Sequence, residues 1–194
     1  VFSEEIVSVD KGNITKFIIH QTVDDGSVKL WTHSFQIKLI DKRGNSKLLN
    51  IENMEKYFDL SEVAKEFKPV QVLYNTNGFG YGVFPIYKNK IYAYKDLKDE
   101  VIRGYQFINL YENMLIGKVT PLETYQVYLA AIQQENNELV VNYLSNNMQT
   151  IFWAFLTKEQ QSKIQKQTEN KIYTLLEKDL PANIKKTLFS LYQT

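Results

Sequence analysis

The chain has 194 residues, of which 44% are hydrophobic, so one large or two small folded domains are expected and a disordered chain is excluded. Its 23 basic and 22 acidic residues give a formal net charge of +1, which argues against nucleic acid or an anionic membrane as a partner. The chain has no cysteine, which excludes disulfides and thiolate metal ligands, and none of its apolar runs approaches the roughly 18 to 20 residues that span a bilayer.

The first residues, VFSEE, alternate like a β-strand from the outset. They include neither an initiator methionine nor the basic-then-apolar layout of a signal peptide. We therefore expect the chain to begin inside a longer protein. The composition does not fix a cellular compartment.

The first ninety residues carry the period-two patterns and turn signals of short β-strands. A turn at residues 10–13 (DKGN) favours a hairpin, and residues 60–67 read as a short helix between strands. Strands are predicted at residues 14–22, 28–41, 47–51, 70–74 and 81–87. Five or more short strands separated by turns predict an antiparallel β-sandwich domain over residues 1–90.

From residue 91 the apolar residues recur at helical spacing. Thr120 and Thr157 are each followed three residues later by Glu or Gln, which is the pattern of a capping box, and Pro181 is typical of a helix start. The link at residues 135–137 is short, so the helices beside it should be antiparallel. Residues 91–194 are predicted to be the start of a domain of stacked α-helical hairpins, which makes the chain α+β in two parts.

Two histidines are the obvious candidates for chemistry. His20 and His33 lie on predicted strands, and no H-E-x-x-H or other paired-ligand spacing occurs. A metal site would need both to converge with a carboxylate, whereas ordinary strand histidines are far commoner than ligands. We therefore assign no catalytic, cofactor-binding or metal-binding residue to this chain.

Other motifs favour structural interpretations. The glycines of residues 75–82 alternate and lead into a predicted strand, so a tight turn is favoured over a phosphate-binding loop. No serine lies in a G-x-S-x-G or S-x-x-K pattern. The 13 tyrosines lie largely on apolar stripes, which favours a role in the core over base stacking, and the charges of residues 159–177 suit a solvated helix face.

The order of these elements resembles the segment that follows the catalytic domain in gluzincin zinc aminopeptidases of the aminopeptidase N type. Residues 10–21 (DKGNITKFIIHQ) are similar to that family's D-x-G-x-I-x-x-F-x-I-x-Q pattern, and residues 33–41 to its H-x-x-x-I-x-L-x-D. The arginine-proline pair that often precedes this histidine is replaced by Trp31-Thr32. Residues 70–75 and 80–82 are similar to the next strands, Arg103 to an arginine-bearing helix, and residues 132–139 to a helical hairpin link.

This resemblance implies a non-catalytic C-terminal portion of a zinc metallo-aminopeptidase. The parent enzyme would bind zinc through H-E-x-x-H and a distant glutamate, none of which has a counterpart here, so no cofactor is expected in this chain. The sandwich would be a spacer, and the helices would form part of a cover that restricts the access of peptide substrates. The implied partners are the catalytic domain and the remaining helices of the parent.

Three rival interpretations remain. A stand-alone module that binds a protein or peptide fits the missing catalysis equally well. A helical repeat that binds nucleic acid is disfavoured by the near-zero net charge, and a hydrolase built on Asp or Tyr has no support in the residue spacing. For the aminopeptidase portion we expect Trp153 and Phe155 to lie at a partly exposed apolar surface, because residues 151–156 (IFWAFL) are apolar on nearly every side.

Overall fold

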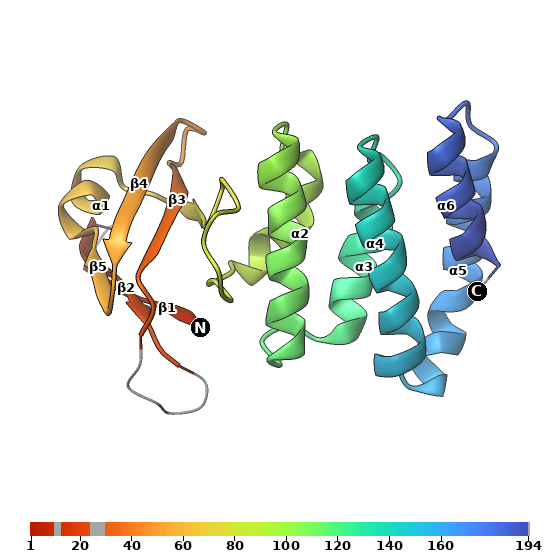
Figure 1. Cartoon of the computed structure of the whole chain (residues 1–194), viewed down its shortest axis with the longest axis horizontal. Coiled ribbons are helices and arrows are strands. Elements are labelled where there is room, and N and C mark those ends of the chain that lie inside the picture. The colour runs from red at the N-terminus through yellow and green to blue at the C-terminus, as the bar shows by residue number, and fades with distance from the viewer. Residues whose placement is uncertain (10–12, 24–29, 194) are drawn as a thin grey trace. The chain divides into compact units, whose positions relative to one another are not determined.

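The computed structural model describes residues 1–9, 13–23 and 30–193 of the chain. It divides into two compact units, Val1–Tyr87 and Lys88–Thr194 (Figure 1). The first unit contains two small antiparallel sheets and the second is helical, so the predicted α+β class is confirmed. None of the helices in the described ranges is both long and apolar enough to cross a membrane.

Each sheet of the first unit has three strands. One has the order β1-β2-β5 and the other β4-β3-β6, and all pairings are antiparallel. Helix α1, Ser61–Phe67, follows β5 and contacts β2. The strands are β1 Phe2–Val9, β2 Asn13–Gln21, β3 His33–Ile40, β4 Ser46–Met54, β5 Tyr57–Asp59 and β6 Gln71–Leu73.

The core of this unit follows from the two-residue period of its strands. Phe17 and Ile19 of β2 are fully buried, as are Ile37 and Leu39 of β3, whereas the residues between them are partly exposed. Rings from separate segments join this core: Phe2 of β1 stacks on Phe84 with ring centroids 4.3 Å apart, and Phe35 of β3 meets Phe84 edge-on at 4.9 Å. Each such buried side chain contributes roughly 1.5 to 3 kcal/mol to stability.

The strand predicted at residues 81–87 is wrong. No strand forms there, and a clamped loop takes its place. The buried side chain of Asn75, a residue with φ of 51°, accepts a hydrogen bond from Gly80 N at 2.7 Å and donates one to Gly80 O at 2.8 Å. A Cβ on Gly80 would lie 3.0 Å from both Phe35 and Phe84, so this glycine is required by close packing. The tight-turn interpretation of residues 75–82 is confirmed by positive φ at Gly78 and Gly82.

Other strand predictions differ in their limits. Strand β5 was not predicted, and it has only three residues. The predicted hairpin turn at residues 10–13 lies largely outside the described residues. So do residues 28–29 at the start of the predicted strand 28–41, of which β3 forms His33–Ile40. The short helix predicted at residues 60–67 is confirmed as α1.

The second unit is a series of helices, several of which begin at the predicted caps. Thr120 accepts a hydrogen bond from Glu123 N, and Thr157 forms the complete capping box with Gln160. Pro181 is the N-cap of the last helix. The elements are the 3-10 helix η2 Lys88–Asp96, α2 Glu100–Leu115, α3 Pro121–Ala131, α4 Glu138–Thr150, the π-helical turn η3 Ile151–Phe155, α5 Lys158–Leu176 and α6 Ala182–Tyr192.

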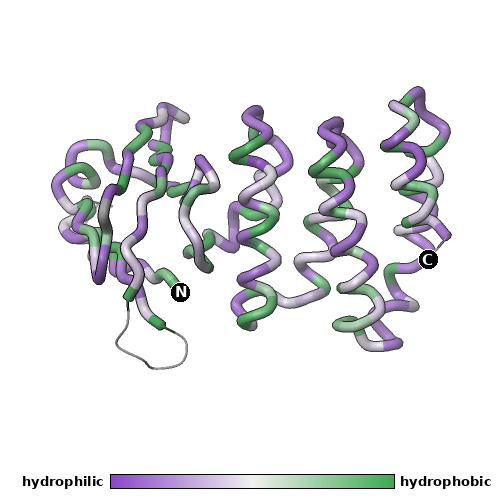
Figure 2. The backbone as a smooth tube through the Cα atoms, in the orientation of Figure 1, coloured by the Kyte–Doolittle hydropathy of each residue, from purple (hydrophilic) through white to green (hydrophobic). Residues whose placement is uncertain are grey.

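The helices bury apolar residues that recur along their length, and Figure 2 shows hydrophobic and hydrophilic residues alternating along the helical part of the chain. Helix α3 contacts α2 and α4, and α6 contacts α4 and α5. Tyr128 of α3 is fully buried beside Phe107 of α2, and its hydroxyl donates a hydrogen bond of 2.7 Å to the Phe107 carbonyl. Burial of this aromatic side chain is therefore combined with a satisfied polar group.

A partly buried carboxyl group lies in the β unit. Glu4 of β1 accepts a hydrogen bond from the fully buried Tyr74 hydroxyl, and the Tyr87 hydroxyl lies 3.4 Å from the same oxygen. Burial raises the pKa of Glu4 above its ordinary value, although the two tyrosine hydrogen bonds oppose this change. Burial also holds the pKa of Tyr74 well above its usual range.

Replacing this carboxyl by an amide should stabilise the protein increasingly as the pH rises. The raised pKa means that the contribution of Glu4 is fully present below its ordinary pKa of 4.5 and is lost as the pH passes the raised value. In Glu4→Gln nothing ionises at this position. The difference in unfolding free energy, variant minus wild type, should therefore increase between pH 4 and pH 8 in urea denaturation. Glu52→Gln, at an exposed position of β4, is the control, and a flat or falling difference for Glu4→Gln would contradict the prediction.

Candidate functional site

The two histidines differ in burial, because His20 faces away from the core and His33 faces it. His20 alternates with the buried Ile19 and Gln21, so it faces away from the core, and its Nε2 lies 3.4 Å from Glu5. His33 faces the core, where its ring meets Phe2 edge-on at 5.1 Å. Burial lowers the pKa of His33, which favours its neutral imidazole.

This arrangement does not fit a zinc site. The two imidazoles point to different faces of the β unit, so they cannot share one ion with a carboxylate. Within the ranges that the structure describes, no group of three or more His, Asp or Glu side chains is placed to hold a metal ion.

The most strongly built polar feature of the helical unit is an ion pair. Arg103 of α2 donates two parallel hydrogen bonds to Glu135, with Nε–Oε2 2.6 Å and Nη2–Oε1 2.7 Å. The side chain of Glu135 is 2% exposed and that of Arg103 12%. Arg103 also donates to the carbonyl of Leu97 at 2.6 Å, so it joins the segment before α2 to the link between α3 and α4.

Glu135 organises that link. Its Oε1 also accepts hydrogen bonds from the backbone N–H groups of Asn136 and Asn137, at 3.0 and 2.9 Å. Burial alone would raise the pKa of Glu135, but the hydrogen bonds from Arg103 and Asn137 outweigh it and hold that pKa below its ordinary value. The same pair raises the pKa of Arg103. Arg103 and Glu135 are therefore both ionised at neutral pH. The side chain of Asn137 caps α4 by accepting hydrogen bonds from Leu139 N and Val140 N.

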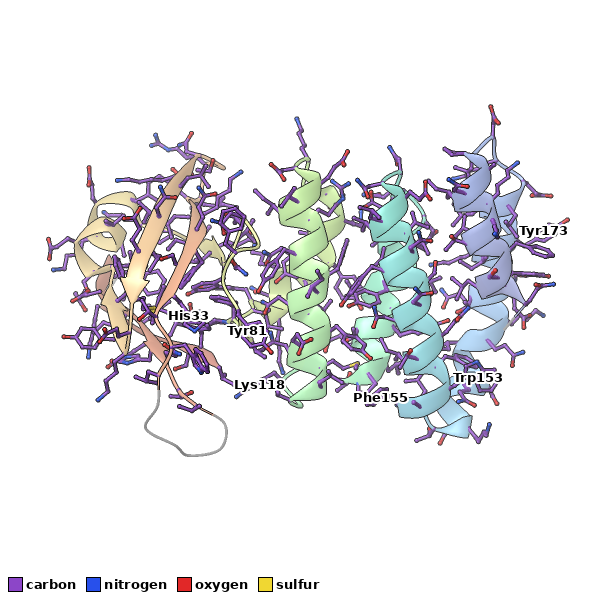
Figure 3. All side chains as sticks on the ribbon, in the orientation of Figure 1. His33, Tyr81, Lys118, Trp153, Phe155 and Tyr173 are labelled. Atoms are coloured by element: carbon purple, nitrogen blue, oxygen red, sulfur yellow. The ribbon has the colours of Figure 1, made fainter. Side chains whose placement is uncertain are left out.

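An apolar turn connects α4 to α5. In the π-helical turn η3, Ile151 is buried, whereas Trp153 is 53% exposed and Phe155 42% exposed (Figure 3). The Gln161 side chain donates to the carbonyl of Phe152 at 2.6 Å, which satisfies a backbone group that the irregular turn leaves open. The predicted partial exposure of Trp153 and Phe155 is confirmed.

A groove of about 470 Å³ runs beside this turn and along α5. Its apolar lining includes Phe152, Trp153, Ile172 and Leu191, and its polar lining includes Gln165, Thr168 and Ser162. Lys158 and Glu169, both on α5, also line it, and the Lys158 ammonium lies 5.6 Å from the Trp153 ring centroid. A volume of this size is typical of sites for small ligands or short peptides.

The outer side of the last helix pair exposes a second apolar surface. Tyr173 of α5 is 53% exposed, and Phe189 and Tyr192 of α6 are 51% and 40% exposed. Tyr173 and Tyr192 lie with ring centroids 6.2 Å apart, and Figure 3 shows Tyr173 on the α5–α6 pair. Lys185, Lys186 and Glu177 border this surface, which we call the α5–α6 face.

No protein-family model matches the chain, and no curated protein matches it. The groove and the ion pair were also missed as sites from the sequence, because their residues come from separate helices. The one sequence signal for the ion pair was its location in two strings compared with the aminopeptidase family, residues 101–105 and 132–139.

Removing one partner of the Arg103–Glu135 pair should strongly destabilise the helical unit. Glu135→Ala leaves a largely buried guanidinium without its carboxylate and two link N–H groups without their acceptor, which should cost roughly 3 to 5 kcal/mol. Urea denaturation followed by helical circular dichroism measures the loss. Arg103→Lys, which keeps the charge but not the two parallel bonds, should lose part of that stability.

The matched control is a surface pair. Lys163 and Glu159 lie 2.6 Å apart with side chains 70% and 76% exposed, so Lys163→Ala should leave the denaturation midpoint nearly unchanged. Equal effects of Glu135→Ala and Lys163→Ala would contradict a structural role for the buried pair.

Proposed function

We propose that this chain is a non-catalytic C-terminal portion of a zinc metallo-aminopeptidase. In this proposal the β unit is a spacer beside the catalytic domain, and the helical unit forms part of the cover that restricts peptide access. The chain itself contributes no zinc ligand and no catalytic residue. Its partners are the catalytic domain and the remaining helices of the parent.

The observation that carries this proposal is the contact between two of the compared strings. Arg103 belongs to the string matched to the family's arginine-bearing helix, and Glu135 to the string matched to its hairpin link. The two residues are 32 positions apart and form a buried, bidentate pair. Each string alone is a weak match, but a shared structural purpose explains why both occur, and in this order.

The proposal also includes a finer description of the fold. The two sheets would form a sandwich, for which the ring contacts of Phe2 with Phe35 and His33 are the support. The helices would form an open stack of antiparallel hairpins, for which the contacts of α3 with α4 and of α5 with α6 are the support. The exposed rings of the α5–α6 face are then the surface on which the next helices pack.

The groove along α5 favours a second candidate function. A stand-alone module that binds a protein or peptide needs a concave, partly apolar surface with placed polar groups, and this groove combines both. It needs no parent enzyme. The two candidates differ in what the surrounding coding sequence must contain.

The coding sequence around this segment is the sharpest test. The proposal requires an H-E-x-x-H motif and a distant glutamate upstream, in frame with residue 1. An in-frame upstream region that lacks this motif would overturn the aminopeptidase proposal and leave the binding module.

The purified chain alone should bind no stoichiometric zinc and should hydrolyse no aminoacyl substrate. Zinc catalysis needs three protein ligands, an open position for water and a base, whereas the chain has two histidines that face apart and no cysteine. Elemental analysis and a fluorogenic aminopeptidase assay measure both, with an active zinc aminopeptidase as positive control. One equivalent of zinc, together with turnover that a chelator abolishes, would contradict this.

A further inference from the structure

We propose that the groove along α5 binds a short extended peptide with free ends, its carboxylate at Lys158 and its ammonium group at Glu169. This goes beyond the function proposed above, because it assigns binding to this chain alone and does not depend on a parent enzyme. Failure of the proposal would leave the aminopeptidase relationship untouched.

Two opposite charges in the lining of the groove select the occupant. Lys158 and Glu169 both line it and lie eleven residues apart on one helix, which corresponds to about 16 Å along the axis. An extended peptide of four or five residues spans about 14 to 17 Å. A free peptide has opposite charges at its ends at that separation, so length and charge match together.

The polar lining between Lys158 and Glu169 suits a peptide backbone. Ser162, Gln165 and Thr168 are spaced three residues apart along α5, so they share one side of the helix. The Ser162 hydroxyl already donates to the Lys158 carbonyl at 3.0 Å, and the Thr168 hydroxyl accepts from the Tyr125 hydroxyl at 3.2 Å. The oxygen lone pairs of Ser162 and the hydroxyl hydrogen of Thr168 remain as an acceptor and a donor for the C=O and N–H groups of an extended chain. The Gln165 amide already donates to Glu169 at 2.8 Å, which orients that carboxylate.

The apolar part of the groove lining suits the side chains of such a peptide. Phe152 and Trp153 from η3, with Leu191 from α6, supply an apolar surface beside the polar row. The Lys158 ammonium lies near the Trp153 ring, which favours its position in the groove lining. A phosphate-bearing ligand is disfavoured, because Lys158 is accompanied by Glu169 rather than by further cations.

The binding is measured by tryptophan fluorescence and calorimetry. In the variant Trp31→Phe the remaining tryptophan is Trp153, which lines the groove, so its emission reports occupancy. The probe is a free-ended pentapeptide of alternating alanine and leucine. We expect saturable binding that weakens about fivefold when the peptide is N-acetylated, and about fivefold when it is C-amidated.

Paired changes test the two contacts. Lys158→Gln should weaken binding of the free peptide but not of the C-amidated one, and Glu169→Gln should weaken binding of the free peptide but not of the N-acetylated one. Lys163→Gln, on the same helix but outside the groove lining, should bind as the parent variant does. All three positions are exposed, and circular dichroism verifies that each variant is folded.

Three results would overturn the proposal. One is the absence of binding at millimolar peptide. Another is binding that neither end-blocking nor the two charge changes affect, which would indicate an internal segment of a longer polypeptide. The third is concentration-dependent self-association that Trp153→Ala abolishes in size-exclusion chromatography, which would show that a second copy of the chain fills the groove.

Discussion

The buried pair of Arg103 and Glu135 is the interaction on which the helical unit depends. It ties three points together: the segment before α2, the link between α3 and α4, and the first turn of α4. Asn137 adds to this junction, because its amide also donates to Glu100 at the start of α2. A charged pair in a largely dry environment is stable only with good geometry and with its remaining hydrogen-bonding capacity satisfied. Both conditions hold here, so the start of α2 is fixed relative to the start of α4.

The β unit is held together by the packing of aromatic rings. Its two sheets are small, so rings from four segments supply much of the buried apolar area: Phe2, Phe35, Tyr74 and Phe84. Phe35 and Phe84 leave little space at Gly80, where a Cβ would lie 3.0 Å from each, and Asn75 fixes the loop by hydrogen bonding to the N–H and the carbonyl of that glycine. The loop that results presents Phe79 and Tyr81 almost wholly to solvent, at 82% and 88% exposure. The loop around Gly80 therefore packs against the aromatic core and also exposes two aromatic side chains to solvent.

Two pairs of groups with shifted pKa values, Glu4 with Tyr74 and Glu135 with Arg103, are partners of each other inside the fold. The surfaces of the helical unit that are open to other molecules include the groove along α5 and the aromatic α5–α6 face. Both the spacer-and-cover proposal and the binding-module alternative use surfaces of this kind.

The sequence by itself determined the elements whose causes are local. Thr120 and Thr157 predict helix starts, because a capping side chain bonds within the first turn of its own helix. Strands β2 and β3 are predictable because one buried face imposes a two-residue period on their sequence. The sequence pattern wrongly predicts a strand at residues 81–87, where Gly80 packs closely against Phe35 and Phe84 and the chain forms a loop. It also misses β5, because three residues are too few to show a period. The pairing of Arg103 with Glu135, the outward turn of His20 and the inward turn of His33, and a groove assembled from η3, α5 and α6 were decided only by the tertiary structure. The physical reason is that these features depend on which distant segments meet, and a local pattern contains no record of that.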